Sequence, residues 1–228
     1  IRTDIDNTDE SLRSLCEYMY INNVTAGNIF SKSSGDIDIY ADIRSVYSCA
    51  LSANNNIDSI QFYNAYTGKM YCAGGAMDEA ANQLDDIMNC ADRIVSNTMV
   101  LRTVKYIENM KIVERPVFSY FIYESSNISR DSSFLVVNLK CEWLMDCVER
   151  YSKLDEDNKF FIFNYNTELF MYSNEAELKG YETVIRDAVD NKNAYVCING
   201  RKYVLNTVVM EEQGLTICSL VSAYTAYK

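Results

Sequence analysis

The sequence contains no histidine. Without an imidazole, the chain cannot build Ser–His–Asp or Cys–His nucleophile pairs, or zinc sites with histidine ligands. It also has one proline, eight glycines and no low-complexity stretch, which argues against a linker, a fibre or a disordered tail. No uninterrupted apolar run approaches the roughly 18 residues that a membrane helix needs. These shortages exclude the enzyme classes that depend on histidine and favour a globular chain.

Basic residues are also scarce. The chain has 21 Lys and Arg against 32 Asp and Glu, a net charge of −11. Because binding to phosphate backbones needs clustered Lys and Arg, we expect no nucleic-acid partner. At 228 residues and 48% hydrophobic, the chain can form one large domain or two small ones. It begins at Ile1 without a signal-peptide pattern, so we expect an excised fragment.

Eight cysteines are present, and none forms a Cys-x-x-Cys pair. An even count in an exported domain allows disulfides, and this alternative stays open. However, Cys72, Cys197 and Cys218 stand among apolar neighbours, where cysteine behaves as a small hydrophobe. We therefore expect mostly free thiols, no metal site and no cofactor.

Hydrophobic periodicity predicts a long helix over residues 8–31 and a second helix that carries Ile39 to Ala50, with Asp36 as its cap. A hairpin of residues 57–64 and 69–73 turns at Gly68. The elements expected after it are a helix over 78–96, strands over 113–124 and 132–139, a helix over 142–151, strands over 159–164 and 169–173, a helix over 175–190, and strands over 194–198, 202–210 and 215–221.

A hairpin, a helical crossing and antiparallel strands thus occur once over residues 57–140 and again over 159–221. Antiparallel sheets need a helix to cover one face. We therefore predict an α+β fold in which a long N-terminal helix precedes two tandem modules. The predicted domains are a helical segment at 1–56 and modules at 57–150 and 151–228; chance periodicity is the alternative.

This layout resembles the double-Cache sensor family, in which a long helix carries two PAS-like modules. Residues 134–144 (FLVVNLKCEWL) are similar to the last strand of the family's first module and its linking helix, where a G-V-L-G-x-D-x-x-L-D-W-L pattern is usual. Residues 214–227 resemble the final strand, and residues 57–73 the first two strands of the membrane-distal module. The resemblance spans nearly the whole chain as a pattern of elements.

The resemblance implies a non-enzymatic, extracytoplasmic sensing domain between two transmembrane helices. A small molecule would bind in the distal module, and the proximal module would pass the signal to a histidine kinase, chemoreceptor, cyclic-dinucleotide enzyme or AraC-type regulator. It also implies a homodimer formed through the N-terminal helix.

The sequence departs from family members that bind amino acids. Their Arg-x-Trp-Tyr segment is missing, because the only tryptophan is Trp143 in the linking helix. Asn138 stands at the position that resembles the family's acidic residue, and it carries no charge. A standard amino acid is therefore disfavoured as the ligand.

A small-ligand site needs apolar walls and a few convergent polar groups. The candidates in the distal module are Tyr63, Tyr71, Arg93, Arg102, Tyr106, Arg115, Tyr120, Tyr123 and Asn138. Because Tyr120 and Tyr123 are an odd number of positions apart on a strand, only one of them is expected to line the site. Each tyrosine is alternatively ordinary core with its hydroxyl satisfied at the edge.

The polar candidates also have two interpretations. Arg102 and Arg115 can clamp a ligand carboxylate, or they are surface charges in an acid-rich module. Asn138, inside an apolar run, needs hydrogen-bond partners if it faces inward.

Two rival functions stay open at this point. One is an interaction module without a small ligand, dimerised by the long helix. The other is a hydrolase that depends on carboxylates, but Asp85-Asp86 and Glu211-Glu212 are adjacent pairs whose side chains diverge.

Overall fold

The described part of the chain contains two five-stranded antiparallel sheets with flanking helices. The structure is a computed structural model that describes residues 2–21, 27, 36–74, 83–89, 91, 99–123, 128–154, 159–164, 169–172, 181–211 and 213–226. The chain divides into two compact units, Arg2–Glu142 and Trp143–Lys228.

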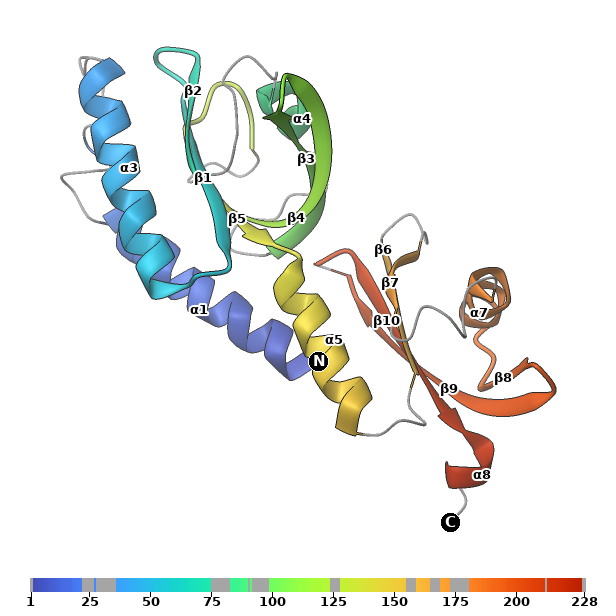
Figure 1. Cartoon of the computed structure of the whole chain (residues 1–228). Helices are drawn as coiled ribbons and strands as arrows, with labels where there is room; N and C mark the ends of the chain where they lie inside the picture. The colour runs from blue at the N-terminus through green and yellow to red at the C-terminus, as the bar shows by residue number, and fades with distance from the viewer. Residues whose placement is uncertain are drawn as a thin grey trace. The chain divides into compact units, whose positions relative to one another are not determined.

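The first unit holds sheet A. Its strands are β1 (Ile57–Asn64), β2 (Lys69–Gly74), β3 (Met99–Glu108), β4 (Lys111–Tyr123) and β5 (Phe134–Lys140), in the order β2-β1-β5-β4-β3. The helices are α1 (Arg2–Ile21), α3 (Asp36–Ala53) and the short α4 (Gln83–Met88). In Figure 1, α3 runs along β1 and β2, while α4 lies inside the curve of β3 and β4.

The second unit holds sheet B. Its strands are β6 (Lys159–Asn164), β7 (Leu169–Tyr172), β8 (Tyr195–Ile198), β9 (Arg201–Met210) and β10 (Leu215–Ser222), in the order β7-β6-β10-β9-β8. The helices are α5 (Glu142–Leu154), which begins at the last residue of the first unit, α7 (Glu182–Asp190) and α8 (Ala223–Ala226).

Both sheets have the same strand order, in which the first strand pairs with the last. The repeat read from the sequence is therefore a repeat of topology, and the predicted α+β fold with two PAS-like antiparallel modules is confirmed. Helices α1 and α3 belong to the same compact unit as sheet A. The finer division at residues 56 and 150 stays a prediction.

The two long helices cover one face of sheet A, which we call the helix face. Helix α1 buries Ile5, Leu12, Cys16 and Met19, a stripe at the helical spacing that the sequence predicted. From α3, Tyr40 packs edge-on against Tyr71 of β2, with ring centroids 5.5 Å apart.

The opposite face of sheet A, which we call the α4 face, has an apolar half and a polar half. The apolar half is a cluster of buried side chains in which Ile87 of α4 packs on the strands. The strand and loop residues of this cluster are Tyr63, Phe121, Tyr123, Ile128, Phe134 and Val136.

Sheet B buries an apolar cluster with α7. From the helix come Ile185 and Ala188. From the strands come Phe161, Phe163, Val196, Ile198, Tyr203, Leu205, Cys218 and Leu220. This cluster is the core of the second unit.

Most predicted strands are confirmed within one or two residues, but strand β3 was missed. No element was predicted between residues 97 and 112, because Arg102, Thr103 and Lys105 obscure the alternation of this stretch. Both of its faces are buried at the start, since Val100, Leu101 and Arg102 are all less than 9% exposed. A strand with two buried faces shows no clean period of two.

Three predicted helices are described only in part. Helix α1 begins at Arg2, before the predicted start at residue 8, and is described up to Ile21. Helix α4 ends at Met88, although the prediction continued to residue 96. Helix α7 begins at Glu182 after its N-cap Tyr181, although the prediction began at residue 175. The predicted ends at residues 28–31, 92–96 and 175–180 lie outside the described residues, as does Arg93.

The seven described cysteines are free thiols, as predicted, and Cys90 lies outside the described residues. Among the helices that the structure describes, none has the length and apolar character to cross a membrane.

Candidate functional site

Five polar side chains meet in the buried polar half of the α4 face. They come from four strands: Ser59 and Gln61 from β1, Arg102 from β3, Ser119 from β4 and Asn138 from β5. The register explains the meeting, because Ser59 and Ser119 both pair with Asn138, on either side of β5. We call these five residues the polar network.

Arg102 is the centre of the polar network. Its Nε donates to Ser119 Oγ at 2.6 Å, and its Nη2 donates to Gln61 Oε1 at 2.7 Å and to Asn138 Oδ1 at 3.1 Å. The guanidinium carbon also lies 5.7 Å from the ring centroid of Phe121. The long arginine side chain therefore spans the α4 face from β3 to β1.

Asn138 connects the rest of the network. Its Oδ1 accepts from Ser119 Oγ at 2.6 Å, and its Nδ2 donates to Ser59 Oγ at 3.0 Å and to Gln61 Oε1 at 3.3 Å. The side chain is fully buried. The expectation that an inward Asn138 needs partners is therefore met.

Burial makes this arrangement costly. Arg102 is 7% exposed, and Ser59, Gln61, Ser119 and Asn138 are 0% exposed. Buried polar groups are tolerated when they are hydrogen-bonded, and a buried charge requires strong compensation. The hydrogen bonds within the polar network therefore compensate for the burial of these groups.

Cys72 of β2 borders the polar network, since it pairs with Gln61. Burial raises the pKa of the Cys72 thiol to about 11, although a hydrogen bond with Gln61 and the charge of Arg102 act to lower it. The thiol is therefore protonated at neutral pH and behaves as a neutral neighbour of the network.

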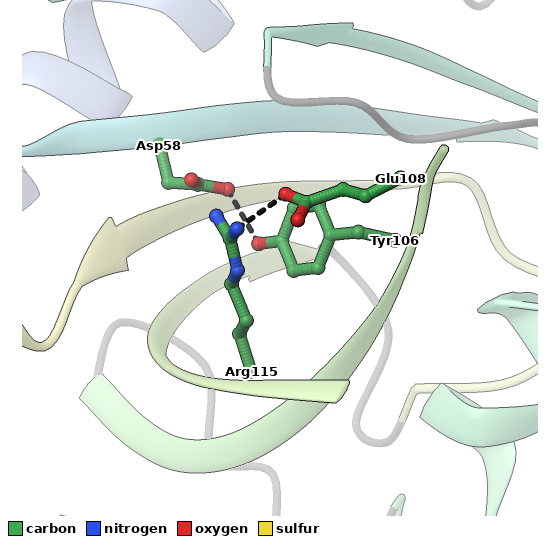
Figure 2. A network of polar contacts seen from close by, with 4 residues as sticks. All are labelled: Asp58, Tyr106, Glu108 and Arg115. Carbon is green, nitrogen blue, oxygen red and sulfur yellow. Dashed lines mark hydrogen bonds and ion pairs between the residues drawn. The ribbon is translucent and has the colours of Figure 1, made fainter. Parts of the chain in front are cut away.

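A second group of contacts continues from Ser59 to Asp58. Asp58 Oδ2 accepts from Ser59 Oγ at 2.9 Å and from the Tyr106 hydroxyl at 2.6 Å. Burial, then the hydrogen bond to Asp58 and its negative charge, raise the pKa of Tyr106, against the opposing charges of Arg102 and Arg115. Figure 2 shows the Tyr106 hydroxyl directed at the Asp58 carboxylate.

Asp58 also contacts helix α3. Its backbone carbonyl accepts from the Tyr47 hydroxyl at 3.2 Å. Gly74, at φ +83°, makes room for this contact, because an added Cβ would overlap the Tyr47 ring and approach the Asp58 carbonyl. A continuous series of hydrogen bonds therefore runs from Arg102 through Asn138, Ser59 and Asp58 to α3.

Arg115 lies outside the polar network. It pairs with Glu108 across the β3–β4 hairpin, and its guanidinium carbon lies 5.4 Å from the centroid of the Tyr106 ring (Figure 2). The Arg115 side chain is 49% exposed. The surface-charge interpretation therefore describes Arg115, whereas Arg102 is a buried residue.

The structure brings some predicted site residues together and separates others. Tyr63, Tyr106, Tyr123, Arg102, Arg115 and Asn138 share the α4 face, as the strand pairing requires. Tyr63 packs against Phe134, with ring centroids 5.0 Å apart, and donates to the carbonyl of Arg130 at 2.9 Å. Tyr63 and Tyr123 thus belong to the apolar half, next to the polar network.

Tyr71 and Tyr120 lie on the helix face instead. Tyr71 packs against Tyr40 of α3. Burial raises the pKa of Tyr120, and Arg13 of α1 partly opposes this shift. Tyr120 and Tyr123 therefore point to opposite faces, as their odd spacing indicated, and Tyr71 and Tyr120 are buried in the core of the helix face.

The sequence analysis named Arg102 and Asn138 but missed Ser59, Gln61 and Ser119. A signal was available in the strands themselves. Gln61 stands between Ile60 and Phe62, and Ser119 stands between Phe118 and Tyr120. All four of these neighbours are buried. An isolated polar residue in a strand whose neighbours are buried is typical of a polar group that faces an interior.

The two acidic residues of α4 form ion pairs. Asp85 pairs with Arg130, and Asp86 Oδ1 lies 3.1 Å from Lys105 Nζ. In the described part of the chain, no group of three or more cysteines and carboxylates is placed to hold a metal ion. The polar network offers one cation and neutral hydrogen-bonding groups, a set suited to binding a small molecule.

No protein-family model and no curated protein matches the chain. Solved structures match it over nearly its whole length. The extracellular domain of the protein named histidine kinase vpHK1S-Z8 has a TM-score of 0.59 and 10% identity, over 97% of this chain and 90% of that one.

Two further structures are similar to the chain. The ligand-binding domain of the Campylobacter jejuni chemoreceptor Tlp3, in complex with L-valine, has a TM-score of 0.58 and 13% identity, over 100% of this chain and 96% of that one. A domain of a sensory box/GGDEF family protein from Vibrio parahaemolyticus has a TM-score of 0.52 and 14% identity, over 98% of this chain and 99% of that one. The chain has the double-Cache fold.

The double-Cache fold was predicted from the layout of elements, and these similarities confirm it. The names of the matching structures describe extracellular, ligand-binding and sensory domains.

Proposed function

We propose that this chain is the extracytoplasmic small-molecule sensing domain of a membrane-anchored bacterial signalling protein. The ligand binds on the α4 face of sheet A, where it contacts the polar network. The chain itself is not an enzyme. The full protein passes the signal to a cytoplasmic histidine kinase, chemoreceptor module or AraC-type regulator.

The observation that supports this proposal is the buried position of Arg102 among polar partners from three other strands. Ligand sites combine apolar walls with a few oriented polar groups. The α4 face has both, because the aromatic residues Tyr63, Phe121 and Phe134 adjoin the polar network on the same strands. A site on rigid strands also keeps its donors in place before the ligand arrives.

Signalling follows from the hydrogen bonds between the polar network and α3. A ligand shifts a two-state equilibrium only by its differential affinity for the two states. A ligand that contacts Asn138 acts on Ser59 and Asp58, and the Asp58 carbonyl holds Tyr47 of α3. A small displacement of the N-terminal helices is therefore the expected output.

The location and assembly belong to the same proposal. The domain stands on the outer side of the membrane between two transmembrane helices that lie outside this sequence, and two copies pair through the N-terminal helix. A ligand-free module dimerised by the same helix is the competing function, and ligand binding separates the two.

A thermal-shift screen with a broad metabolite library tests the proposal, followed by calorimetry on each hit. A ligand that binds the folded state raises the melting temperature by mass action. We expect Arg102→Gln to weaken the binding of a hit by about 30-fold or more, because truncating one partner of a buried charged hydrogen bond costs about 2–5 kcal/mol.

Arg201→Gln, at an exposed position of β9 in sheet B, is the matched control and should leave affinity unchanged. Far-UV circular dichroism and urea unfolding confirm that each variant is folded. A library without a single hit, or a hit that binds Arg102→Gln as tightly as the parent, would contradict the proposed site.

A further inference from the structure

We propose that Asp58 couples the polar network to helix α3, and that a β-bulge at this residue gives it that role. The inference rests on the proposed function and deepens it, because it names the residue through which a ligand at the polar network acts on the N-terminal helices. Asp58 acts through Ser59 on one side and Tyr47 on the other, so it is a positioning residue.

The bulge is visible in the pairing of β1 with β5. Ile57 pairs with Leu139. The next pair is Ser59 with Asn138, so Asp58 is an extra residue in β1. Successive side chains of a regular strand point to opposite faces, and a bulge changes the direction of the side chain that it carries. A regular β1 would therefore place Asp58 and Ser59 on opposite faces of sheet A.

With the bulge, the carboxylate of Asp58 lies on the α4 face beside the Ser59 side chain. Its Oδ2 accepts from Ser59 Oγ at 2.9 Å and from the Tyr106 hydroxyl at 2.6 Å. Ser59 Oγ in turn accepts from Asn138 Nδ2 at 3.0 Å. The carboxylate is therefore joined to the polar network by a single hydroxyl group and is held by β3 through Tyr106.

The backbone of the same residue holds α3. The Asp58 carbonyl accepts from the Tyr47 hydroxyl at 3.2 Å. Gly74, opposite Ser59 on β2, permits this approach, because an added Cβ would overlap the Tyr47 ring and lie 2.7 Å from the Asp58 carbonyl oxygen. Side chain and backbone of one residue thus bind different elements. A displacement of the Asp58 carboxylate therefore moves the acceptor of the Tyr47 hydroxyl as well.

Hydrogen exchange of α3, followed by mass spectrometry on peptides from residues 36–53, tests the coupling. Ser59→Ala removes the hydroxyl group that joins the polar network to Asp58, so it replaces the action of a ligand and no ligand is needed. The exchange is measured with and without Ser59→Ala in four proteins: the parent, Tyr47→Phe, Asp58→Ala and Asp58→Asn. Exchange of β4 in the same samples separates an effect on α3 from unfolding of the whole unit.

In the parent protein, Ser59→Ala should speed the exchange of α3 by at least about 3-fold and leave β4 unchanged, because residues in one hydrogen-bond network are coupled. In Tyr47→Phe and in Asp58→Ala it should have no further effect, since the connection is already broken. Asp58→Asn keeps an oxygen that can take the place of Oδ2, so part of the response should return. Asp131→Ala, at an exposed aspartate of the same unit, is the control and should leave the response at its parental size.

A response to Ser59→Ala that persists in Asp58→Ala would overturn the role of Asp58. Equal acceleration of α3 and β4, or no acceleration of α3 in the parent, would overturn the coupling itself. These failures are distinguishable from failure of the proposed function, because the exchange experiment uses no ligand. A metabolite library without a hit contradicts the sensor proposal, whereas α3 exchange that ignores Ser59→Ala contradicts the inference about Asp58.

Discussion

Sheet A and sheet B have the same topology, but the side chains on their buried faces differ in polarity. In each unit, the face that packs against the helix between the second and third strands of the sheet is buried. In sheet A this face holds the polar network, whereas in sheet B it holds an apolar cluster with α7. Among the described residues, the two copies of the fold therefore differ in what they bury, and the polar network belongs to sheet A.

The strand pairing allows individual positions of sheet A to be compared with the equivalent positions of sheet B. Strands β1 and β6 end at Asn64 and Asn164, and their partners begin at Lys69 and Leu169, which aligns the first hairpins. Following the registers outward from this hairpin, the positions of Gln61, Arg102, Ser119 and Asn138 correspond to Phe161, Val196, Leu205 and Leu220.

All four of these sheet B residues are apolar and at most 7% exposed. Apolar residues at these positions are therefore sufficient to build the fold. The polar side chains of sheet A are therefore not a requirement of the topology.

The largest expected effect comes from giving sheet B one residue of the polar network. Leu220→Asn, at the position of Asn138, buries an amide among Phe161, Leu205 and Cys218. Loss of the apolar contacts and an unpaired amide should lower the free energy of unfolding of the second unit by about 3–5 kcal/mol. Hydrogen exchange followed by mass spectrometry should show faster exchange over residues 181–222.

Leu220→Met is the matched control, because a swap that conserves volume costs less than about 1.5 kcal/mol. Stability of Leu220→Asn equal to that of Leu220→Met would mean that sheet B also provides polar partners at this position, and the contrast between the sheets would fail.

The repeat could be predicted from the sequence, because the hydrophobic periods of helices and strands are visible in a single sequence. The sequence was not sufficient to find β3, which carries Arg102. The start of this strand is buried on both faces, and its second half is the extension of a hairpin, so a period of two never appears cleanly. The missed strand is the one that delivers the only charged residue of the polar network.

The sequence predicted a site of polar and aromatic residues in the first unit, but it did not identify all the residues of the polar network. Asn138 stood out because it interrupts a run of apolar residues. Ser59 did not stand out, since it follows the polar Asp58 and its role here depends on being opposite Asn138. Which face a strand residue takes is fixed by register, and register is a property of pairs of strands that one strand's pattern does not contain.

A smaller effect on stability is expected for a substitution of Tyr106. This residue lies in the outer part of the β3–β4 hairpin, which is longer than the β8–β9 hairpin of sheet B. The folded-state pKa of Tyr106 is raised, first by burial and then by Asp58. Its contribution to stability is therefore present below the ordinary tyrosine pKa of about 10 and is lost as the pH rises above that value. Tyr106→Phe should cost about 1–2 kcal/mol at pH 8 through the lost hydrogen bond, and its stability should fall less steeply above pH 10.

Urea unfolding from pH 8 to pH 11 measures both quantities. Tyr195→Phe, an exposed tyrosine of β8, controls for removal of a hydroxyl and should change stability at pH 8 by less than about 0.5 kcal/mol. An unchanged alkaline slope in Tyr106→Phe would show that the Tyr106–Asp58 contact does not persist in solution.

The smallest expected effect concerns the two tight hairpins of the two sheets. The β8–β9 turn uses Asn199 and Gly200, at φ 50° and 74°, while the β3–β4 turn uses Asn109 and Met110, at φ 50° and 60°. Glycine adopts this left-handed region freely, whereas a residue with a Cβ is strained there, and Met110 is 97% exposed and so forgoes little packing. Met110→Gly should therefore raise the melting temperature slightly, with a gain of about 0.5–1 kcal/mol, and Gly200→Met should lower it by a similar amount. If Met110→Gly instead destabilises the protein, the methionine contributes contacts that its exposure does not reveal, and the two hairpins are not equivalent turns.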